Sequence, residues 1–480
     1  MMNTGFQGLP ISEVVPDAIA GMQEGLSKSS LLVSRRKIRF QPQTGTSATP
    51  GSIVQFVLAD SSSLLDVNSA TISFTITTST AGSAVAPVAL DDGVSWCRRM
   101  QVSLNGNLVS DVDHAHRLAN MEIYASADKA WYGAAGSFGG WWKFNPDLAT
   151  GVFPSTAATA AAYNPAFGDT AADITGAAGT AGATWISAGT RHAAGENRIV
   201  PLSLLDGFWR CKQYVPLNLL GELVVSFTLA SNEEAILAYS DTTATYTMTD
   251  IFMECDVVQP HYALNEIMLK QANSEGENGI VIPYESAVVS QGQALTSGTS
   301  SVIVSRATNN LRRCLYAQQL TSGLSVRAFP SVSCFGFNAT SNWQVRCGSL
   351  YFPSQPATTA ARMYGLLTSA YGAAVNDKPG IMNRLTYTTT SLGTVALSVA
   401  GSVPAKLINT DNFIVGYNFD AYKNTGGTNV LDADGLSVLG MAGSQVVFQV
   451  SQTGTVSPVV SLHATRYLSL QNGTLKIVGV

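Results

Sequence analysis

The chain has 480 residues, of which 46% are hydrophobic and only 12% are charged, and its formal net charge at pH 7 is −5. Soluble domains carry about 25% charged residues, so we expect much of this surface to lie against neighbouring molecules. The negative net charge excludes a protein that wraps nucleic acid through clustered basic side chains, and no sequence-specific nucleic-acid binding is expected.

We expect no secretion signal in the N-terminal segment. Acidic residues outnumber Lys28 in the first thirty positions, and no apolar run there is long enough for export or membrane crossing. Residues 9–27 favour an amphipathic helix, because apolar residues recur at helical spacing, although Pro16 interrupts the pattern. We therefore predict an N-terminal arm over residues 1–32 that docks on its own domain or on a neighbour.

Strand signals dominate from Val33 onward. The basic segment Ser34–Phe40 is typical of a strand with one wetted face, and a second strand is expected near residues 52–59. In the third, residues 70–78, apolar residues alternate with Ser and Thr. A period of two places the apolar side chains on one face of a sheet and the hydroxyl groups on the other.

A hairpin and a helix follow. Asn105-Gly106 is a strong hairpin signal, because both residue types tolerate positive φ. We expect a helix to begin near Asp113, which can cap it, and its apolar side includes Leu118 and Met121.

Residues 127–195 differ in character from the segments around them. Aromatic residues come first, and an Ala/Gly/Thr-rich stretch follows that is too long for an ordinary loop of a compact domain. The aromatic residues Trp131, Tyr132, Trp141 and Trp142 could bind a sugar, but we favour a role as inter-subunit contacts.

The second half of the chain repeats the order of elements about 245 residues later. Strand signals at 279–286, 300–306 and 314–320 correspond to the first three strands, and a second helix is expected around Tyr364. The sequence therefore predicts an all-β protein with two tandem β domains of similar topology, each with one helix after its fourth or fifth strand. The predicted domain ranges are 33–260, which includes the 127–195 insertion, and 261–480.

Sequence motifs typical of catalytic, metal-binding or cofactor-binding sites are weak or absent. The six cysteines form no C-x-x-C pair, and no nucleophile elbow, phosphate-binding loop or zinc-protease motif occurs. In Asp111–Arg117, His114 and His116 would point to different faces of a helix and could not easily share an ion. Asp91-Asp92 is more typical of a turn than of paired catalytic acids. We predict no catalytic, cofactor-binding or metal residues.

Several segments in both halves resemble the double jelly-roll major capsid proteins of double-stranded DNA viruses, in particular the polinton-like virus, adintovirus and virophage group. The segments that carry the resemblance are "SIVQFVLADSSSLLDVNSATISFTI", "CRRMQVSLNGNLVSDVDHAHRLANMEIY", "PLNLLGELVVSFTLA" and "GSLYFPSQPATTAARMYGLL". The resemblance implies two eight-stranded antiparallel jelly rolls, each with a short helix in a connection between strands. It also implies structural turns at Asn105 and Gly106 and at Pro353 and Pro356.

The resemblance further implies a structural role without catalysis. Such proteins form homotrimers with a pseudo-hexameric outline, and these capsomers tile an icosahedral shell. The expected partners are other copies of the chain, penton proteins, minor or cement capsid proteins and, in some cases, an internal membrane beneath the shell. The expected location is the virion, assembled inside the host cell.

Three other functional hypotheses are alternatives to a double jelly-roll capsid protein. A single jelly-roll capsid protein with a projecting domain, as in small RNA viruses, usually has a basic N-terminal arm, which this acidic terminus lacks. A β-rich receptor-binding protein or adhesin would show extended repeats or clear aromatic sugar platforms. A β-rich hydrolase is the weakest alternative, because no pair of acid and base residues stands out.

Overall fold

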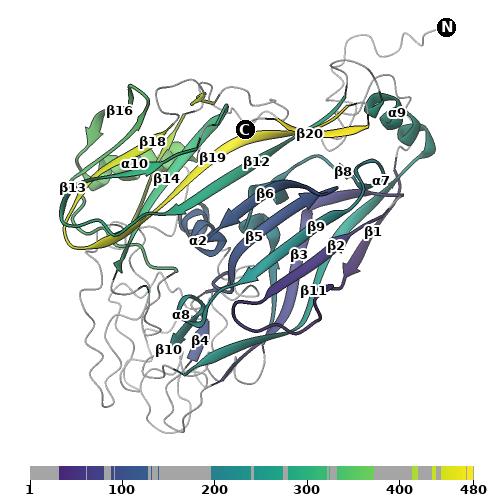
Figure 1. Ribbon diagram of the computed structural model, residues 1–480, viewed down its shortest axis with the longest axis horizontal. Coiled ribbons are helices and arrows are strands. Elements are labelled where there is room, and N and C mark those ends of the chain that lie inside the picture. Colours follow the sequence, from purple (N-terminus) through teal and green to yellow (C-terminus); the bar gives the residue numbers. More distant parts are fainter. Residues whose placement is uncertain are drawn as a thin grey trace.

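The structure is a computed structural model of the whole chain (Figure 1). It describes residues 32–127 except 61, 80–87 and 91; residues 196–371 except 239–242, 274–278, 307, 322–323 and 325–331; residues 413–419, 435–438 and 445–478 except 472; and the single residues 131, 139 and 387.

The first half of the chain forms two antiparallel sheets packed face to face, which we call the first roll. Their strand orders are β1-β11-β3-β7 and β2-β9-β5-β6. The strands are β1 (Leu32–Phe40), β2 (Ile53–Leu58), β3 (Leu64–Ser79), β5 (Cys97–Leu104), β6 (Asn107–Asp113), β7 (Glu196–Pro201), β9 (Leu223–Leu229) and β11 (Thr245–Pro260). Short strands β4 (Val88–Leu90) and β10 (Ile236–Ala238) pair with each other, and β8 (Val215–Pro216) pairs with β3.

The second half forms another pair of sheets, which we call the second roll. Their orders are β12-β19-β14-β17 and β13-β18-β15-β16. The strands are β12 (Ile280–Gln291), β13 (Gly298–Val304), β14 (Leu311–Leu320), β15 (Asn342–Cys347), β16 (Leu350–Ala357), β17 (Ile414–Asn418), β18 (Val446–Gln452) and β19 (Val456–Gln471), and β20 (Thr474–Val478) adds to β19. In both rolls the main strands pair in the order 1-8-3-6 and 2-7-4-5, so the predicted pair of antiparallel jelly rolls is confirmed.

One helix follows the fifth main strand of each roll. Helix α2 (Ala115–Ser126) follows β6, and α10 (Ala360–Ala370) follows β16. Their first residues lie 245 positions apart, which is the repeat distance expected from the sequence. The remaining described helices are η6 (Leu202–Leu204), η7 (Gly207–Arg210), α7 (Leu217–Leu220), α8 (Asn232–Ala235) and α9 (Tyr262–Ala272).

Alternating apolar residues build the core of each roll. In β9 every second side chain from Leu223 to Leu229 is buried, as the sequence period predicts. Between the sheets of the first roll, the Trp96 ring lies 5.1 Å from the Phe74 ring and 5.8 Å from the Phe227 ring. Such tilted contacts suit the charge distribution of aromatic rings. The core therefore sits between the two sheets of each roll.

The hairpin between β5 and β6 has the geometry that its sequence favours. Asn105 and Gly106 have φ values of 47° and 77° and connect Leu104 to its antiparallel partner Asn107. A two-residue turn with both φ values positive matches the right-handed twist of the flanking strands.

Pro353 and Pro356 lie in strand β16 and not in a turn, so this sequence expectation is wrong. Strand β16 is an edge strand that pairs only with β15, and its register shifts between Trp343 and Val345 of that partner. Proline is tolerated at such irregular edge positions because its missing N–H is not needed by a neighbouring strand. The Phe352–Pro353 peptide bond is cis.

The strands of the two rolls are separate in sequence, since β11 ends at Pro260 and β12 begins at Ile280. Helix α9 lies between them and joins the rolls (Figure 1). Among the residues that the structure describes, no helix combines the length and apolar character needed to cross a bilayer.

Candidate functional site

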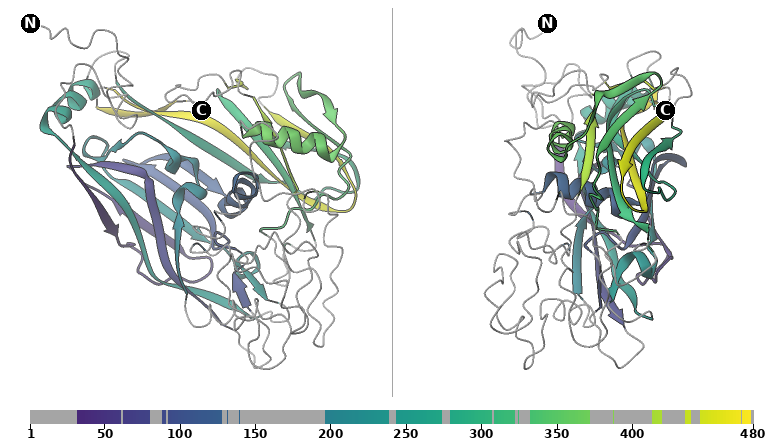
Figure 2. Two further views of the ribbon diagram at one scale, coloured as in Figure 1. Left: turned by 180° about the vertical axis from the view of Figure 1, so that it is seen from behind. Right: turned by 90° about the vertical axis from the view of Figure 1, so that its left-hand side faces the viewer.

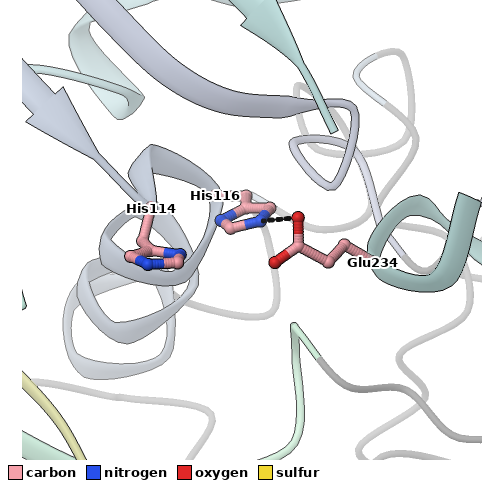
Figure 3. Close-up of side chains that lie close together, drawn as sticks. All are labelled: His114, His116 and Glu234. Carbon is pink, nitrogen blue, oxygen red and sulfur yellow. Dashed lines mark ion pairs between the residues drawn. The ribbon is translucent and has the colours of Figure 1, made fainter. Parts of the chain in front are cut away.

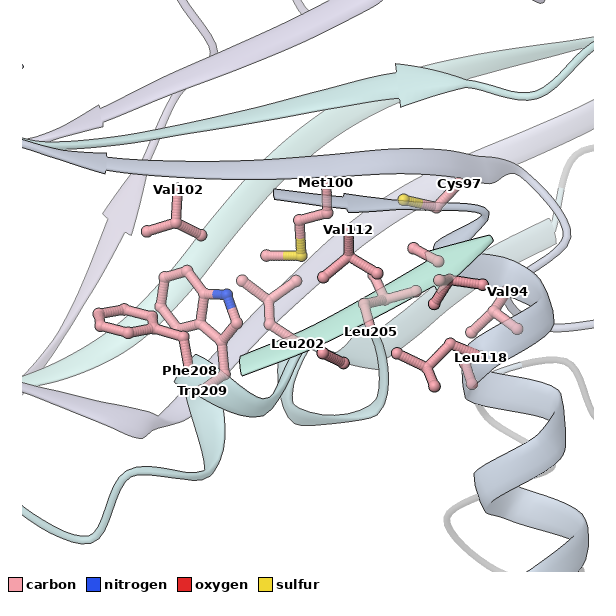
Figure 4. Close-up of a cluster of buried hydrophobic side chains, with 14 of the residues drawn as sticks. Val94, Cys97, Met100, Val102, Val112, Leu118, Leu202, Leu205, Phe208 and Trp209 are labelled. Carbon is pink, nitrogen blue, oxygen red and sulfur yellow. The ribbon is translucent and has the colours of Figure 1, made fainter. Parts of the chain in front are cut away.

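The junction between the two rolls contains a group of buried charged side chains, and helix α2 lies at its centre. Ten successive residues of α2, Ala115–Tyr124, are buried. Its apolar side, with Leu118, packs against β5 and η6, and the Leu202 and Leu205 side chains belong to the same buried cluster (Figure 4). This packing fixes the helix on the first roll and turns its polar side toward the second.

Hydrogen bonds from α2 cross to the second roll. The Arg117 Nε donates to Gln319 Oε1 at 3.0 Å, and the Tyr124 hydroxyl donates to the Ser333 carbonyl at 2.7 Å. In the opposite direction, the Tyr284 hydroxyl of β12 donates to the Val109 carbonyl of β6 at 2.9 Å. Buried bonds in both directions require one relative placement of the two rolls.

A buried cluster of ion pairs, the Glu122 cluster, lies beneath these bonds. Glu122 of α2 contacts the guanidinium groups of Arg210 and Arg313, the latter at 3.1 Å. Arg313 also lies 2.7 Å from Glu285, and so does the Nδ1 atom of His463. The cluster combines α2 and η7 of the first roll with β12, β14 and β19 of the second.

The cluster balances its charges. Burial alone would raise the pKa of Glu122 and of Glu285, but the neighbouring arginines hold the pKa of both carboxyl groups below the ordinary value. Burial and the Arg313 charge lower the pKa of His463, which favours its neutral form. Two carboxylates then face two guanidinium groups, and His463 can donate from Nδ1 to Glu285 while Nε2 accepts from Ser461.

A second buried group, the Glu234 cluster, lies at the start of α2. Glu234 contacts Arg117 at 3.2 Å and Arg98 at 3.4 Å, and His116 Nε2 lies 3.7 Å from its carboxylate. Burial alone would raise the pKa of Glu234, but His116 and the two arginines lower it. This cluster holds the first turn of α2 against helix α8.

His114 and His116 lie side by side, so the expectation that they diverge is wrong (Figure 3). The helix begins only at Ala115, and His114 precedes it with a left-handed φ of 53°. That conformation stacks the two rings with centroids 5.9 Å apart. Asp113 does not cap the helix either, because its carboxylate accepts from the His114 N–H directly after it.

Among the residues that the structure describes, two groups of three place possible metal ligands within 4.8 Å of one another: His114, His116 and Glu234, and Glu122, Glu285 and His463. In each group an arginine guanidinium already contacts the carboxylates that a metal ion would need. Arg117 does so in the first group and Arg313 in the second. The Arg117 guanidinium contacts both His114 Nδ1 and Glu234, and the Arg117 N–H donates to His116 Nδ1. Burial and the Arg117 charge lower the pKa of His114 to about 3. A metal ion would have to displace a guanidinium group that matches the carboxylate geometry.

The aromatic residues expected at subunit contacts are only partly described. Trp131 is half-buried and packs against the core of its own chain. Tyr132, Trp141 and Trp142 lie outside the described residues, as does the rest of the 127–195 insertion apart from Ala127, Trp131 and Gly139.

Of the residues in these two clusters, only His116 and Arg117 lie in a segment that the sequence singled out, Asp111–Arg117. Glu122 is separated from Arg210 by 88 positions and from Arg313 by 191, so no local pattern connects them. One signal was present: both helices begin with Ala-x-Arg, at Ala115–Arg117 and Ala360–Arg362. The repeated arginine marks equivalent helix starts.

The sequence matches no protein-family model and no curated protein. Solved structures are nevertheless similar in fold. The chain resembles the Faustovirus major capsid protein with a TM-score of 0.53 and 8% identity, covering 93% of this chain and 92% of that one. It resembles a chain of the Sputnik virophage with a TM-score of 0.52 and 13% identity, covering 95% and 90%.

A third structure, VP54 of PBCV-1, aligns with a TM-score of 0.52 and 8% identity over 95% of this chain and 98% of that one. The fold is the double jelly roll of viral major capsid proteins. Two rolls of equal topology rule out the single jelly roll with a projecting domain considered above. In this double jelly roll, the two buried clusters lie where the rolls meet.

Proposed function

We propose that the protein is a structural major capsid protein that trimerises into pseudo-hexameric capsomers, which tile an icosahedral virion shell. The observation that carries the proposal is the double jelly-roll fold, which extends over nearly the whole chain and over nearly the whole of the viral capsid proteins it resembles. The proposed location is the virion, and the proposed partners are other copies of the chain, penton proteins and minor capsid proteins.

The junction between the two rolls supports such a structural role. A shell subunit must present its two rolls at a fixed angle, because a trimer built from two rolls per chain has a pseudo-sixfold outline only if the angle within each chain is constant. The bonds from Arg117 to Gln319 and from Tyr284 to Val109 restrict that angle. The low share of charged residues fits a molecule that covers much of its surface with neighbours.

Three of the buried carboxylates, those of Glu122, Glu234 and Glu285, support a role without catalysis. A general acid at neutral pH needs a raised pKa, whereas the pKa values of Glu122, Glu234 and Glu285 are lowered by arginine and histidine partners. These groups remain ionised and bound in ion pairs. They stabilise the junction and offer no group ready to transfer a proton.

The basic strand β1 gives little support to nucleic-acid binding. Arg35 forms ion pairs with Asp66 and Asp256, each at 2.7 Å, and Arg36 lies 3.3 Å from Asp60. Partners within the chain neutralise these side chains, so they offer little net charge to a phosphate backbone.

The test is the native mass of the purified protein in solution. We expect a stable particle of three times the 50.5 kDa chain mass, and at higher concentration we expect electron micrographs to show hexagonal capsomers or closed shells. A monomer that persists at micromolar concentration would reject the proposal. A β-rich adhesin would instead bind a glycan array without forming such a particle.

A further inference from the structure

Helix α9, which joins the two rolls, has one buried side and one exposed side. Leu264, Met268 and Ala272 are buried, and the helix contacts β12 and β19 of the second roll. On the other side, Tyr262 and Leu269 are 72% and 41% exposed. Because these two residues are seven positions apart, about two turns of a helix, they lie on the same side of α9. The exposed side of α9 therefore carries a pair of apolar side chains.

Strand β1 begins beside the first turn of α9. Its first residue, Leu32, pairs with Pro260 at the end of β11, and α9 begins two residues later at Tyr262. Figure 2 shows α9 at the end of the molecule where β1 starts. Among the described residues, the two most exposed large apolar side chains are Tyr262 and Val33, at 72% and 60%. An exposed apolar surface therefore lies where residues 1–31 join the described part of the chain.

The sequence of the N-terminal arm contains a segment with a matching apolar side. Ile19, Met22 and Leu26 recur at helical spacing and would lie on one side of a helix. The acidic residues Asp17 and Glu24 would lie on the opposite side. A proline precedes them at position 16, where the first turn of a helix tolerates it. This pattern is typical of a helix that buries one side against a partner and leaves the other in water.

The connection between this segment and β1 is long enough for the arm to lie along α9. Residues 27–31 separate Leu26 from β1, and five extended residues span at most about 17 Å. A helix that leads into β1 from the side of α9 would run antiparallel to α9, as β1 runs antiparallel to β11. In that direction Leu26 comes opposite Tyr262. Ile19 then comes opposite Leu269, because the two residues of each helix are separated by seven positions.

We propose that residues 16–26 form a helix that binds the exposed side of α9 in the same chain, with Leu26 against Tyr262 and Ile19 against Leu269. The arm of the same chain is the favoured occupant, because a short connection holds it near α9 at an effective concentration on the order of millimolar. Binding removes the exposed apolar side chains of α9 from water and covers the helix that joins the two rolls. The contact does not depend on trimerisation, so its failure would leave the proposed function unaffected.

Hydrogen–deuterium exchange of the full-length chain tests this contact. In the wild type we expect the backbone amides of residues 17–26 to exchange at least about tenfold more slowly than those of an unstructured chain. The double variant Y262S/L269S should lose this protection, because it removes both apolar partners. The matched control I53S/I199S removes two side chains that are 55% and 51% exposed on β2 and β7, and it should keep the protection. A wild type without protection, or equal protection in Y262S/L269S, would overturn the inference.

Engineered cysteines test which copy the arm binds and which of its sides faces α9. The six native cysteines are buried, so they compete little with the new thiols. With oxidised glutathione we expect I19C/L269C to form a disulfide within one chain, which keeps the monomer mass under denaturing, non-reducing conditions. The matched control D17C/L269C should form it at least about tenfold more slowly, because Asp17 lies on the opposite side of the predicted helix and a disulfide requires close Cβ atoms.

Three results of the cysteine experiment would overturn the inference, even if Y262S/L269S failed to fold. Disulfides between chains would assign the exposed side of α9 to the arm of a second copy. Equal rates for the two variants would exclude a helix with one side against α9. No disulfide in I19C/L269C would exclude the contact itself.

Discussion

Glu122 links the two rolls, because its carboxylate contacts two arginines from different rolls. Arg210 lies on η7 of the first roll and Arg313 on β14 of the second. Removing one partner of a buried ion pair leaves the others charged and unpaired, which costs about 3–5 kcal/mol.

We therefore expect E122Q to lower the free energy of unfolding by about this amount, measured by urea denaturation at fixed protein concentration. E266Q is the control, because Glu266 is exposed on α9 and its loss should stay within about 0.5 kcal/mol. Equal stability of the two variants would show that the Glu122 cluster is not a stabilising contact.

Asp206 makes the folding stability depend on pH with the opposite sign to the contribution of Glu122, Glu234 and Glu285. Its carboxylate is buried, and Oδ1 accepts from the Ser110 hydroxyl and the Phe208 N–H, while Oδ2 has no hydrogen-bond partner. Burial raises its pKa from 3.8 to about 6, and the Glu285 charge adds to the rise while Arg210 opposes it.

The unfolded chain therefore loses this proton at lower pH than the folded chain does. Stability falls as pH rises from about 4 to about 6, by an amount of order 3 kcal/mol, and stays reduced above that range. The lowered pKa values of Glu122, Glu234 and Glu285 act in the other direction, and their contribution is lost only below their unfolded pKa of about 4.5. D206N keeps the accepting oxygen without the charge.

We expect the difference in unfolding free energy between D206N and the wild type to shift in favour of D206N as pH rises from 4.5 to 7, measured by urea denaturation at each pH. The same difference at every pH would mean that Asp206 titrates alike in the folded and unfolded states.

At the scale of single elements, substitutions at two glycines distinguish the effect of backbone conformation on stability from the effect of steric contact. A Cβ atom added at Gly106 or at Gly365 would meet nothing within 4 Å. Gly106 has a positive φ in the β5–β6 hairpin, whereas Gly365 lies inside α10. The two positions differ in backbone conformation alone.

We expect G106A to destabilise the protein by about 1–2 kcal/mol, because L-residues with a side chain disfavour the left-handed region. G365A should stabilise it by about 0.5–1 kcal/mol, because alanine favours helix over glycine. Thermal unfolding of both variants at one protein concentration gives the comparison. Effects of the same sign would contradict the conformational explanation.

Elements could be predicted from the sequence where a local signal determines them. The alternation in β9, the Asn105-Gly106 hairpin and the spacing of the two helices all depend on residues close in sequence. Sites formed by distant residues could not be predicted. The stacking of His114 on His116 depends on the left-handed backbone conformation of His114, which no residue pattern in the sequence predicts. The Glu122 cluster joins residues of five elements that are far apart in the sequence. The turn predicted at Pro353 failed because proline marks an edge strand as well as a turn.

At the scale of the whole molecule, the junction determines whether the two rolls act as one rigid body. Its contacts are buried, so added salt should screen them little, unlike exposed ion pairs. Residues 274–278 lie in the sequence between α9 and β12, so a cleavage site inserted there interrupts no strand of either roll.

We expect a chain with a protease site inserted among residues 274–278 to keep its native mass after cleavage, even in about 1 M salt. Native mass spectrometry measures whether the two fragments stay together. The same cleavage in E122Q should release fragments at a lower denaturant concentration, because that variant leaves Arg210 and Arg313 without their shared carboxylate. Fragments that separate on cleavage in dilute buffer would show that α9 and the linker, and not the buried junction, hold the rolls together, and a fixed angle within each capsomer would then need contacts from neighbouring copies.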